Sequence, residues 1–403
     1  MRKNQKREMA GPLKDIRVLE VAKALAGPQV GMLLADMGAE VVKIEVPRIG
    51  DECRYWSPQL KGIGTFFLAF NRNKKSITLN LKSKKGVEIF YELAKKSDVV
   101  IENNRVGMMD KLGMGYSALK KIKPDIIFTS VTGFGQTGPY APLPAYEIIA
   151  QAMGGMMDLT GFPDGPPVRT GPGLGDILAA LYALYGTMVA LYHREKTGEG
   201  QYVDASIFDS VAASLENVIT NFDLLGVVAK RVGSRVRTIT PYNCYQVKDG
   251  YVVIAVGNDE QWKRLASAIG RKELAESPQL KTNLKRVENA DEVDKILQAW
   301  LDGRTIGEAI QILRKSDVPC APVYSIDQMV KDPQFTERKL AQKVSYEGLG
   351  FFNVIGILPK LSLSPGQIHS NPPKLGQHNE EILGGLLGYS NEKIRALEKD
   401  GVV

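Results

Sequence analysis

Short apolar runs alternate with amphipathic stretches along roughly the first half of the chain. The run Ile16–Val21 is typical of a buried strand, and residues 26–40 carry apolar positions at helical spacing that end at Gly38. Val41–Ile44 predicts a second strand, so the chain opens with a β-α-β unit. The alternation continues with strands predicted from Ser76, Asp98 and Pro124 and with helices predicted over 82–97 and Tyr116–Lys121. This order predicts an α/β fold with a doubly wound, mostly parallel sheet.

The second half of the chain carries a different pattern. An apolar helix is expected over Ile177–Tyr192, and residues 225–234 are interpreted as a linker. Beyond the linker, Lys248-Asp249-Gly250 separates two alternating apolar runs and predicts a β-hairpin. Helical patterns follow to about Lys315, with Trp262 and Trp300 as expected core residues. We therefore expect a large α/β domain over 1–224, a small α+β domain over 225–320, and over 321–403 a return segment whose helices pack on the large domain.

Composition narrows the class of protein. A chain of 403 residues with 44% apolar and 24% charged residues is ordinary for a globular protein of two domains and excludes a disordered or fibrous one. The first ten residues are basic and lack the apolar centre of a signal peptide, and no later stretch reads as a membrane span, so a cytoplasmic protein is expected. Cys53, Cys244 and Cys320 are too scattered for a disulfide framework or a metal cluster, and no metal site is expected.

A net charge of +7 is compatible with nucleic acid, a membrane surface or anionic metabolites. The lysines are spread along the chain without interleaved aromatic residues, so phosphate-bearing small molecules fit best. The basic stretch Asn71–Lys75, with Lys82 and Arg105, lies at predicted strand ends, where α/β sheets bind ligands. A solvated face is the alternative interpretation of this stretch.

One glycine motif does not carry its usual function. Gly133–Gly138 reads GFGQTG after a predicted strand, which formally matches a dinucleotide-binding turn. That turn must open a helix, and Pro139, Pro142 and Pro144 are incompatible with a regular helix interior. The motif therefore predicts a loop.

Asp176 stands between a glycine-rich turn and the long apolar helix. Aspartate is a favoured N-cap residue, so a capping role is one interpretation. A carboxylate held by glycine-rich backbone beside an apolar helix is also suited to act as a nucleophile. The pattern alone leaves both open.

Several ordered motifs carry a family resemblance over nearly the whole chain: VLEVAKALAGPQVGMLLADMGAEVVKIE, FNRNKKSITLNLK, SVTGFGQTGP, TGFPDGPPVRTGPGLGD, REKTGEGQYVDASIFD and VPCAPV. The chain resembles the family III CoA-transferases, which include formyl-CoA transferase, carnitine CoA-transferase and the α-methylacyl-CoA racemases. The resemblance implies a Rossmann-like large domain, a smaller α+β domain, and a homodimer of two interlocked rings in which both chains form each site. It also implies CoA thioesters and small carboxylic acids as substrates, with no permanently bound cofactor, and neither nucleic acid nor membrane as a partner.

The resemblance also assigns roles to residues of this sequence. Asp176 falls on the family's nucleophile, which forms an acyl anhydride and then a CoA thioester. Tyr146 and Glu147 match a pair that lines the active site, and the loop at Gly257-Asn258 is expected to supply backbone donors for oxyanions. CoA contacts carried over by motif are Ala24, Leu25, Ala26, Leu79, Lys82, Asn103 and Lys111. Further phosphate contacts are suggested by charge alone at Arg48, Arg54, Arg72, Lys74 and Lys75.

Two alternatives to the transferase remain at this stage. The racemase branch places a histidine base where this chain has Tyr146, and the first histidine here is His193, which is better explained as favourable charge at a helix C-terminus. A non-catalytic CoA-binding protein would need Asp176 only as a cap. The chain also lacks the glycine run of formyl-CoA transferases and has Leu25 near their glutamine position, so oxalate is not the expected acceptor. Succinyl-CoA, a common metabolite, is a hypothesis for the donor.

Overall fold

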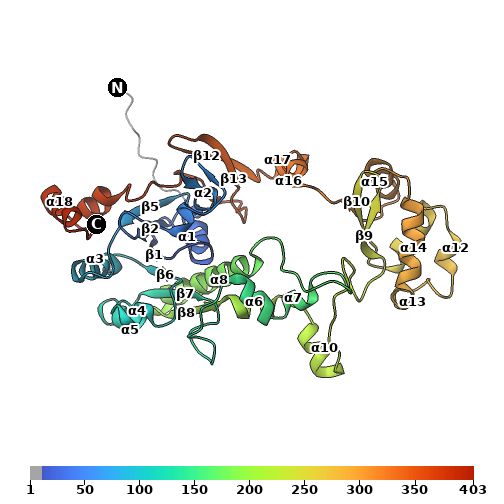
Figure 1. Cartoon of the computed structure of the whole chain (residues 1–403), viewed down its shortest axis with the longest axis horizontal. Coiled ribbons are helices and arrows are strands. Elements are labelled where there is room, and N and C mark those ends of the chain that lie inside the picture. Colours follow the sequence, from blue (N-terminus) through green and yellow to red (C-terminus); the bar gives the residue numbers. More distant parts are fainter. Residues whose placement is uncertain (1–10) are drawn as a thin grey trace. The chain divides into compact units, whose positions relative to one another are not determined.

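The computed structural model describes residues 11–403, so the basic segment 1–10, for which no signal peptide was expected, lies outside the described residues. The chain divides into two compact units. The first comprises Met1–Met156, Thr170–Glu216 and Thr336–Val403, and the second comprises Met157–Arg169 and Asn217–Phe335. Figure 1 labels the elements of both. The domain limits expected from the sequence remain predictions.

The first unit is built on a six-stranded sheet with the order β5-β2-β1-β6-β7-β8. Every neighbouring pair of strands is parallel, which confirms the expected parallel sheet. The strands are β1 (Arg17–Val21), β2 (Glu40–Glu45), β5 (Lys74–Thr78), β6 (Val99–Glu102), β7 (Ile127–Thr132) and β8 (Tyr202–Ser206).

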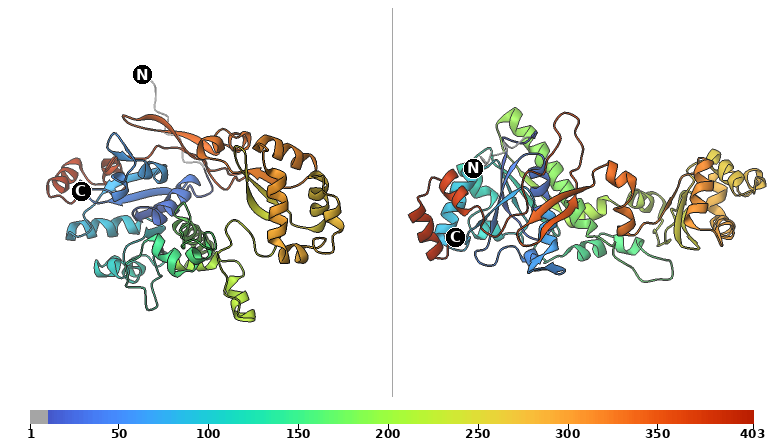
Figure 2. Two further views of the ribbon diagram at one scale, coloured as in Figure 1. Left: turned by 45° about the vertical axis from the view of Figure 1, so that its right-hand side comes forward. Right: turned by 90° about the horizontal axis from the view of Figure 1, so that it is seen from above.

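Neighbouring residues of these strands enter different cores. Val18 packs with apolar residues of α1, α8 and α9, whereas Leu19 packs with those of α3 and α18. Because side chains alternate across a strand, the two cores lie on opposite faces of the sheet, as in a doubly wound fold. The helices are α1 (Ala26–Asp36), α8 (Leu174–Thr197) and α9 (Ile207–Ala213) on one face, and α3 (Lys84–Lys95), α5 (Tyr116–Ile122) and α18 (Asn391–Lys399) on the other. Figures 1 and 2 show the C-terminal α18 beside α3.

The strand order reverses next to β1. β2 and then β5 are added to the sheet on one side of β1, and β6, β7 and β8 are added on its other side. The gap between the loops that follow β1 and β6 is therefore the switch point of the sheet, where α/β proteins bind their ligands at the carboxyl ends of the strands.

The remaining elements of this unit are short. They are η1 (Glu52–Arg54), β3 (Gln59–Leu60), β4 (Ile63–Gly64), α2 (Thr65–Phe70), α4 (Met108–Lys111), α6 (Glu147–Met153), β12 (Ala341–Tyr346), β13 (Gly350–Ile355) and the π-helical turn η2 (Glu380–Leu386). The antiparallel hairpin of β12 and β13 was not predicted from the sequence. Tyr346, Leu349 and Phe352 of the hairpin pack on the small cluster around Phe67, so its strands are fixed by a contact between residues far apart in the chain.

The second unit contains an antiparallel sheet of β9 (Tyr242–Val247), β10 (Gly250–Ala255) and β11 (Cys320–Pro322). β9 and β10 pair from Gly250 opposite Val247, which confirms the predicted hairpin. Trp262 is fully buried in this unit's core, as expected, while Trp300 packs at its margin. The helices of this unit are α10 (Val218–Leu225), α11 (Asp259–Ala268), α12 (Glu273–Glu276), α13 (Asn283–Glu288), α14 (Ala290–Leu301), α15 (Ile306–Lys315) and α16 (Ile326–Met329), and α17 (Pro333–Glu337) crosses the boundary to the first unit. α7 (Met156–Leu159) begins at the unit boundary.

Helix α8 corrects one expectation. Over residues 11–403 it is the one helix that is long and apolar enough to cross a membrane by length and composition, with a mean hydropathy of 1.6 in its most apolar window. The sequence analysis found no such stretch. The same composition is typical of core helices, and α8 places Ala179, Ala180 and Ala183 in the core shared with α1 and β1.

Candidate active site

A cavity of about 450 Å³ opens at the switch point of the sheet. Its walls include the loop after β1, the loop after β6, the end of β7 and the start of α8. The cavity brings together seven of the residues selected from the sequence: Ala24, Leu25, Ala26, Asn103, Tyr146, Glu147 and Asp176. A crevice at this position is where the fold class binds its ligands.

Asp176 does not cap α8. The N-cap residue is Gly173, no side chain caps this end, and Asp176 lies in the first helical turn. The capping interpretation is therefore wrong. The carboxylate instead forms part of the cavity wall and is half-buried.

The surroundings of Asp176 disfavour its ionised form. Burial, followed by the negative charge of Glu147, raises the pKa of Asp176 to about 7. The N-terminal end of a helix favours a negative charge, but this effect is typically below about 1 kcal/mol, whereas burial shifts carboxyl pKa values by several units. Asp176 thus combines appreciable ionisation near neutral pH with greater basicity than an ordinary aspartate, which suits a carboxylate nucleophile.

Glu147 is fixed beside the first turn of α8, which contains Asp176. It begins α6 and is only 9% exposed. Its Oε1 accepts a hydrogen bond from the backbone N–H of Gly175 at 3.0 Å and another from the side chain of Gln151. Gln151 is fully buried and also binds Thr170, with Nε2 donating to Oγ1 at 2.8 Å and Oε1 accepting from the backbone N–H at 3.1 Å. The glutamine therefore ties Glu147 to the turn that precedes α8.

Gly175 allows this close approach. A Cβ atom at this position would lie 2.9 Å from Ile207 Cγ2, 3.0 Å from Val211 Cγ2 and 3.2 Å from Glu147 Oε1. These are shorter than ordinary van der Waals contacts, so a side chain here would push α9 or Glu147 away. The glycine before Asp176 is thus required by packing.

The residues expected to contact CoA differ in their position and exposure. Asn103 lines the cavity and clamps Lys23, whose backbone N–H donates to Oδ1 at 2.8 Å and whose carbonyl accepts from Nδ2 at 2.7 Å. Leu79 is buried at the end of β5. Three basic residues lie in loops or short elements after β2, β5 and β6, and their exposed side chains are accessible to phosphate groups: Arg48, Lys82 and Lys111.

Four of the phosphate candidates form ion pairs within the fold, and three of these four are buried. Arg72 is 1% exposed and its Nη2 lies 2.6 Å from Asp36 Oδ2, while Lys74 is 1% exposed and its Nζ lies 2.9 Å from Glu20 Oε2. Arg54 is likewise buried in an ion pair with Glu45.

Lys75 is the most accessible of the four. Its Nζ bridges Glu40, at 2.5 Å, and Glu381, at 3.0 Å. Charge alone suggested these four phosphate contacts. The structure corrects the expectation for Arg54, Arg72 and Lys74, whose charges are paired with carboxylates inside the fold, and for Lys75 it stays a prediction.

Gly257 and Asn258 belong to the second unit. The backbone N–H of Gly257 donates to Gln261 Oε1 at 2.6 Å, and the Asn258 side chain caps α11 by accepting from the backbone N–H of Gln261 at 2.9 Å. Both groups have partners within their own unit. Their role as oxyanion donors stays a prediction.

Three further observations bear on the sequence hypotheses. No helix follows the Gly133–Gly138 motif until α6, so this segment forms the predicted loop and not a dinucleotide turn. His193 lies on the same helix as Asp176, 17 residues further on, and a rise of 1.5 Å per residue places it about 25 Å away. This separation excludes His193 as a partner of Asp176 within one chain. Within residues 11–403 no three His, Cys, Asp or Glu side chains are grouped to hold a metal ion.

Several residues of the cavity were not predicted from the sequence. Trp56 and Phe66 line it with ring centroids 5.4 Å apart, and Lys23 and Asn104 contribute polar groups. Arg105, which the sequence had selected as a basic residue at a strand end, also lines the cavity. The strand-end position of Asn104 and Arg105 was a usable signal, because the carboxyl ends of β1 and β6 meet at one edge.

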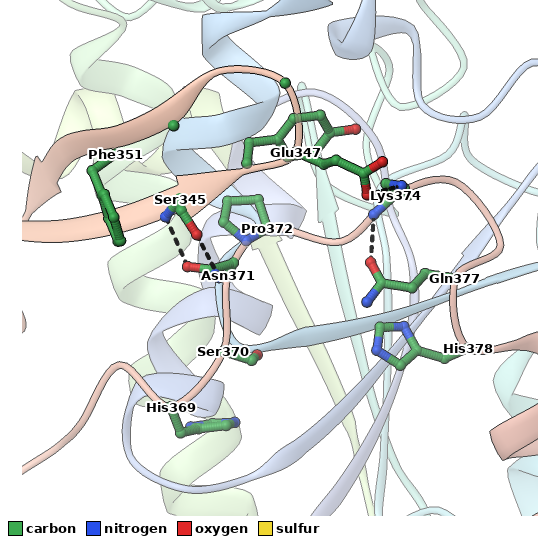
Figure 3. A pocket seen from close by; sticks show the side chains of 13 residues that line it. Ser345, Glu347, Phe351, His369, Ser370, Asn371, Pro372, Lys374, Gln377 and His378 are labelled. Carbon is green, nitrogen blue, oxygen red and sulfur yellow. Dashed lines mark hydrogen bonds and ion pairs between the residues drawn. The ribbon is translucent and has the colours of Figure 1, made fainter. Parts of the chain in front are cut away.

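A larger cavity of about 860 Å³ lies between the β12–β13 hairpin and residues 369–378, and it shares no lining residue with the first. Figure 3 shows its polar side chains engaged with one another. Asn371 bridges the backbone N–H and the hydroxyl of Ser345, Lys374 pairs with Glu347, and His378 Nδ1 accepts from the backbone N–H of Ser76 at 3.0 Å. The smaller cavity is the better candidate for the active site, because it contains the half-buried carboxylate of Asp176 with its raised pKa, whereas the larger cavity is distinguished by its volume alone.

Comparisons with known proteins agree with this geometry. The profile of CoA-transferase family III matches residues 13–379. The chain is 39% identical to the succinyl-CoA–D-citramalate CoA-transferase of Chloroflexus aurantiacus over 97% of this chain and 98% of that protein. It is 36% identical to the human succinyl-CoA:glutarate CoA-transferase over 97% of this chain and 90% of that one.

Among solved structures, a CaiB/BaiF family protein from Brucella suis aligns with a TM-score of 0.83 and 37% identity, covering 94% of this chain and 100% of that one. Both the extent of the sequence match and the shared fold confirm the resemblance seen in the motifs. The chain belongs to CoA-transferase family III and is a CoA-transferase.

Proposed function

We propose that the protein moves CoA from an acyl-CoA thioester to a free carboxylic acid through covalent intermediates on Asp176. The observation that carries the proposal is a half-buried aspartate that caps no helix, lines the cavity at the switch point and has a pKa raised to about 7. Such a perturbed carboxylate in a ligand crevice marks a functional group.

In the first step an Asp176 carboxylate oxygen attacks the acyl carbonyl carbon of the donor, the C–S bond breaks, and CoA leaves as the thiolate. The thiolate then attacks the Asp176 carbonyl carbon of the mixed anhydride and expels the donor acid as a carboxylate. The acceptor carboxylate attacks the resulting aspartyl thioester, and a second anhydride and thiolate form. Attack of this thiolate on the acceptor's acyl carbon restores the Asp176 carboxylate and yields the new thioester. One thioester replaces another, so the net reaction needs no redox partner.

The walls of the cavity suit this chemistry. An anhydride must be protected from water, and Leu25, which is 8% exposed, lines the same cavity wall as Asp176 and the largely buried Glu147. The first-turn N–H groups of α8 favour negative charge at the reacting carbonyl. The Gly257-Asn258 loop is proposed to add donors from the second unit, and an interlocked homodimer is the assembly in which the family resemblance would place it.

We further propose a dicarboxylate substrate pair. Two relatives are named for succinyl-CoA with citramalate or glutarate, which motivates succinyl-CoA as the donor and a C4 or C5 dicarboxylate as the acceptor. For CoA itself, Ala24–Ala26, Leu79 and Asn103 are the proposed contacts, with Arg48, Lys82, Arg105 and Lys111 as the cations for its phosphates. A cytoplasmic location stays a prediction.

The test is to incubate the purified protein with succinyl-CoA and, in separate reactions, citramalate, glutarate or malate, and to follow the new thioester by chromatography. The wild type is expected to form one of these thioesters, and Asp176→Asn to form none while remaining folded. Exchange of an acyl-CoA α-proton with solvent in place of CoA transfer would favour the racemase chemistry and contradict the proposal.

A further inference from the structure

The loop that joins β1 to α1 contains an unusual backbone. Ala24 has a φ of 61°, in the left-handed region that alanine adopts only at a cost of about 1 kcal/mol or more. Leu25 follows as the N-cap residue of α1, where no side chain caps the helix. Both residues line the cavity that contains Asp176. A left-handed alanine in a cavity wall requires contacts that hold it there.

A buried aspartate makes such a contact. Asp51 is 1% exposed, and its Oδ1 accepts a hydrogen bond from the backbone N–H of Ala24 at 3.2 Å. Its Oδ2 lies 2.9 Å from Lys43 Nζ, and the same ammonium donates to the carbonyl of Ala22 at 2.7 Å. One ion pair thus binds the peptide groups on both sides of Lys23.

A second buried lysine holds the first turn of α1, directly after the loop. Lys74 Nζ donates to the carbonyl of Pro28 at 2.7 Å and lies 2.9 Å from Glu20 Oε2. Glu20 also pairs with Lys43 at 2.9 Å, so Glu20, Lys43, Asp51 and Lys74 form one buried tetrad of balanced charge. Buried ion pairs are weak contributors to stability because of their desolvation cost. Their contacts with the loop backbone give this tetrad a structural purpose.

The loop is connected to the nucleophile through Leu25. A Cβ atom built on Gly173 would lie 3.6 Å from Leu25 Cδ2, 3.6 Å from Asp176 Oδ2 and 3.9 Å from Glu147 Cδ. The Leu25 methyl group and the Asp176 carboxylate therefore flank the same small space. A change in the loop at Ala24 would move Leu25 away from the reacting carboxylate.

We propose that Asp51 is a positioning residue of the transferase. By accepting the N–H of Ala24 it holds the left-handed turn that places Leu25 in the cavity wall shared with Asp176 and shapes this wall for the thioester. The inference rests on the proposed function, since it concerns the same site.

The test measures kcat and KM for the acyl-CoA in Asp51→Ala and in the double variant Asp51→Ala/Ala24→Gly. In the single variant KM is expected to rise on the order of tenfold, because the turn loses the contact that offsets its backbone cost. Glycine adopts the left-handed conformation without that cost, so the added Ala24→Gly is expected to recover roughly fivefold of the loss.

A matched control separates positioning from stability. Asp36→Ala also removes a buried aspartate from an ion pair, here with Arg72, at the far end of α1. It is expected to lower the melting temperature and leave KM unchanged. Ala24→Val leaves the tetrad intact and is expected to raise KM, because a β-branched residue disfavours a positive φ.

Three results would overturn the inference: a wild-type KM in folded Asp51→Ala, no recovery in the double variant, or a wild-type KM in Ala24→Val. If Asp51→Ala does not fold, the Ala24→Val result decides. An absence of CoA transfer by the wild type would instead contradict the proposed function, so the two failures are distinguishable.

Discussion

Glu147 Oε1 accepts a hydrogen bond of 3.0 Å from the backbone N–H of Gly175, the residue directly before Asp176. The contact fixes a second carboxylate next to the nucleophile. Together with burial, its charge raises the pKa of Asp176 to about 7. The relationship makes the reactivity of Asp176 dependent on a residue 29 positions earlier in the chain, and it leads to the first prediction.

The rate of acylation is expected to depend on pH through Asp176. Only the carboxylate attacks, so kcat/KM for the donor should rise about tenfold per pH unit below a pKa of about 7 and level off above it. Glu147→Gln removes the neighbouring charge, so the pKa of Asp176 falls and the rise shifts to lower pH. Initial rates from pH 5 to 9 measure this. Glu52→Gln is the control, because it alters another carboxylate of the same cavity that does not contribute to the raised pKa of Asp176. An unshifted profile in Glu147→Gln would contradict the account.

Asp176→Asn is expected to be more stable than the wild type above pH 7. The folded protein holds the proton of Asp176 more tightly than the unfolded chain, because the pKa is raised from 3.8 to about 7. The wild type therefore loses stability as pH rises between these values, by roughly 1–4 kcal/mol in total, and the asparagine variant does not. Denaturant unfolding of both proteins at pH 5 and pH 8 tests this, and an equal difference at the two pH values would contradict it.

Gly175→Ala is expected to lower both stability and turnover. The added methyl group would meet Ile207, Val211 and Glu147 at 2.9–3.2 Å, and overpacking of this kind costs about 1–3 kcal/mol. Gly171→Ala is the matched control, because a Cβ atom there would meet nothing within 4 Å. Thermal unfolding and steady-state rates of the two variants are the measurements. Equal behaviour of the two would show that Gly175 is not required by packing.

Substitutions of Arg72 and Lys82 are expected to have opposite effects, the first on stability and the second on KM for the acyl-CoA. Arg72→Met leaves Asp36 buried and unpaired, which costs about 3–5 kcal/mol of stability, with little change in KM for the acyl-CoA. Lys82→Met removes an exposed charge, so KM should rise severalfold with stability unchanged. Denaturant unfolding and KM of both variants measure this. A large rise in KM for a folded Arg72→Met would restore the phosphate contact suggested by charge alone.

The local signals in the sequence were sufficient for the sheet. Val18 and Leu19 are adjacent apolar residues of the predicted strand Ile16–Val21, which is typical of a parallel strand covered on both faces, and they enter the two cores on opposite faces. The Asp249-Gly250 turn likewise predicted the β9–β10 hairpin. The strands and the hairpin depend on residues that are close together in the chain, so they could be predicted from the local sequence pattern.

The site depended on contacts that no local pattern contains. Arg72 and Lys74 read as exposed charges, but they are paired with Asp36 and Glu20, which lie 36 and 54 residues away. The sequence pattern also could not decide whether Asp176 caps α8 or acts as a nucleophile. The position of the N-cap depends on the backbone geometry at Gly173, which the pattern does not contain. The family motif selected Asp176 as the candidate nucleophile, which stays a prediction, and the physical reason for its raised pKa came from the fold.

The central claim is that Asp176 becomes covalently acylated. The most direct measurement is to incubate the wild type and Asp176→Asn with succinyl-CoA, add hydroxylamine, and determine the mass of the peptide that contains residue 176. The account predicts a hydroxamate on Asp176 in the wild type, dependent on the acyl-CoA, and none in the variant. An unmodified peptide from a wild-type preparation that is transferring CoA would contradict it.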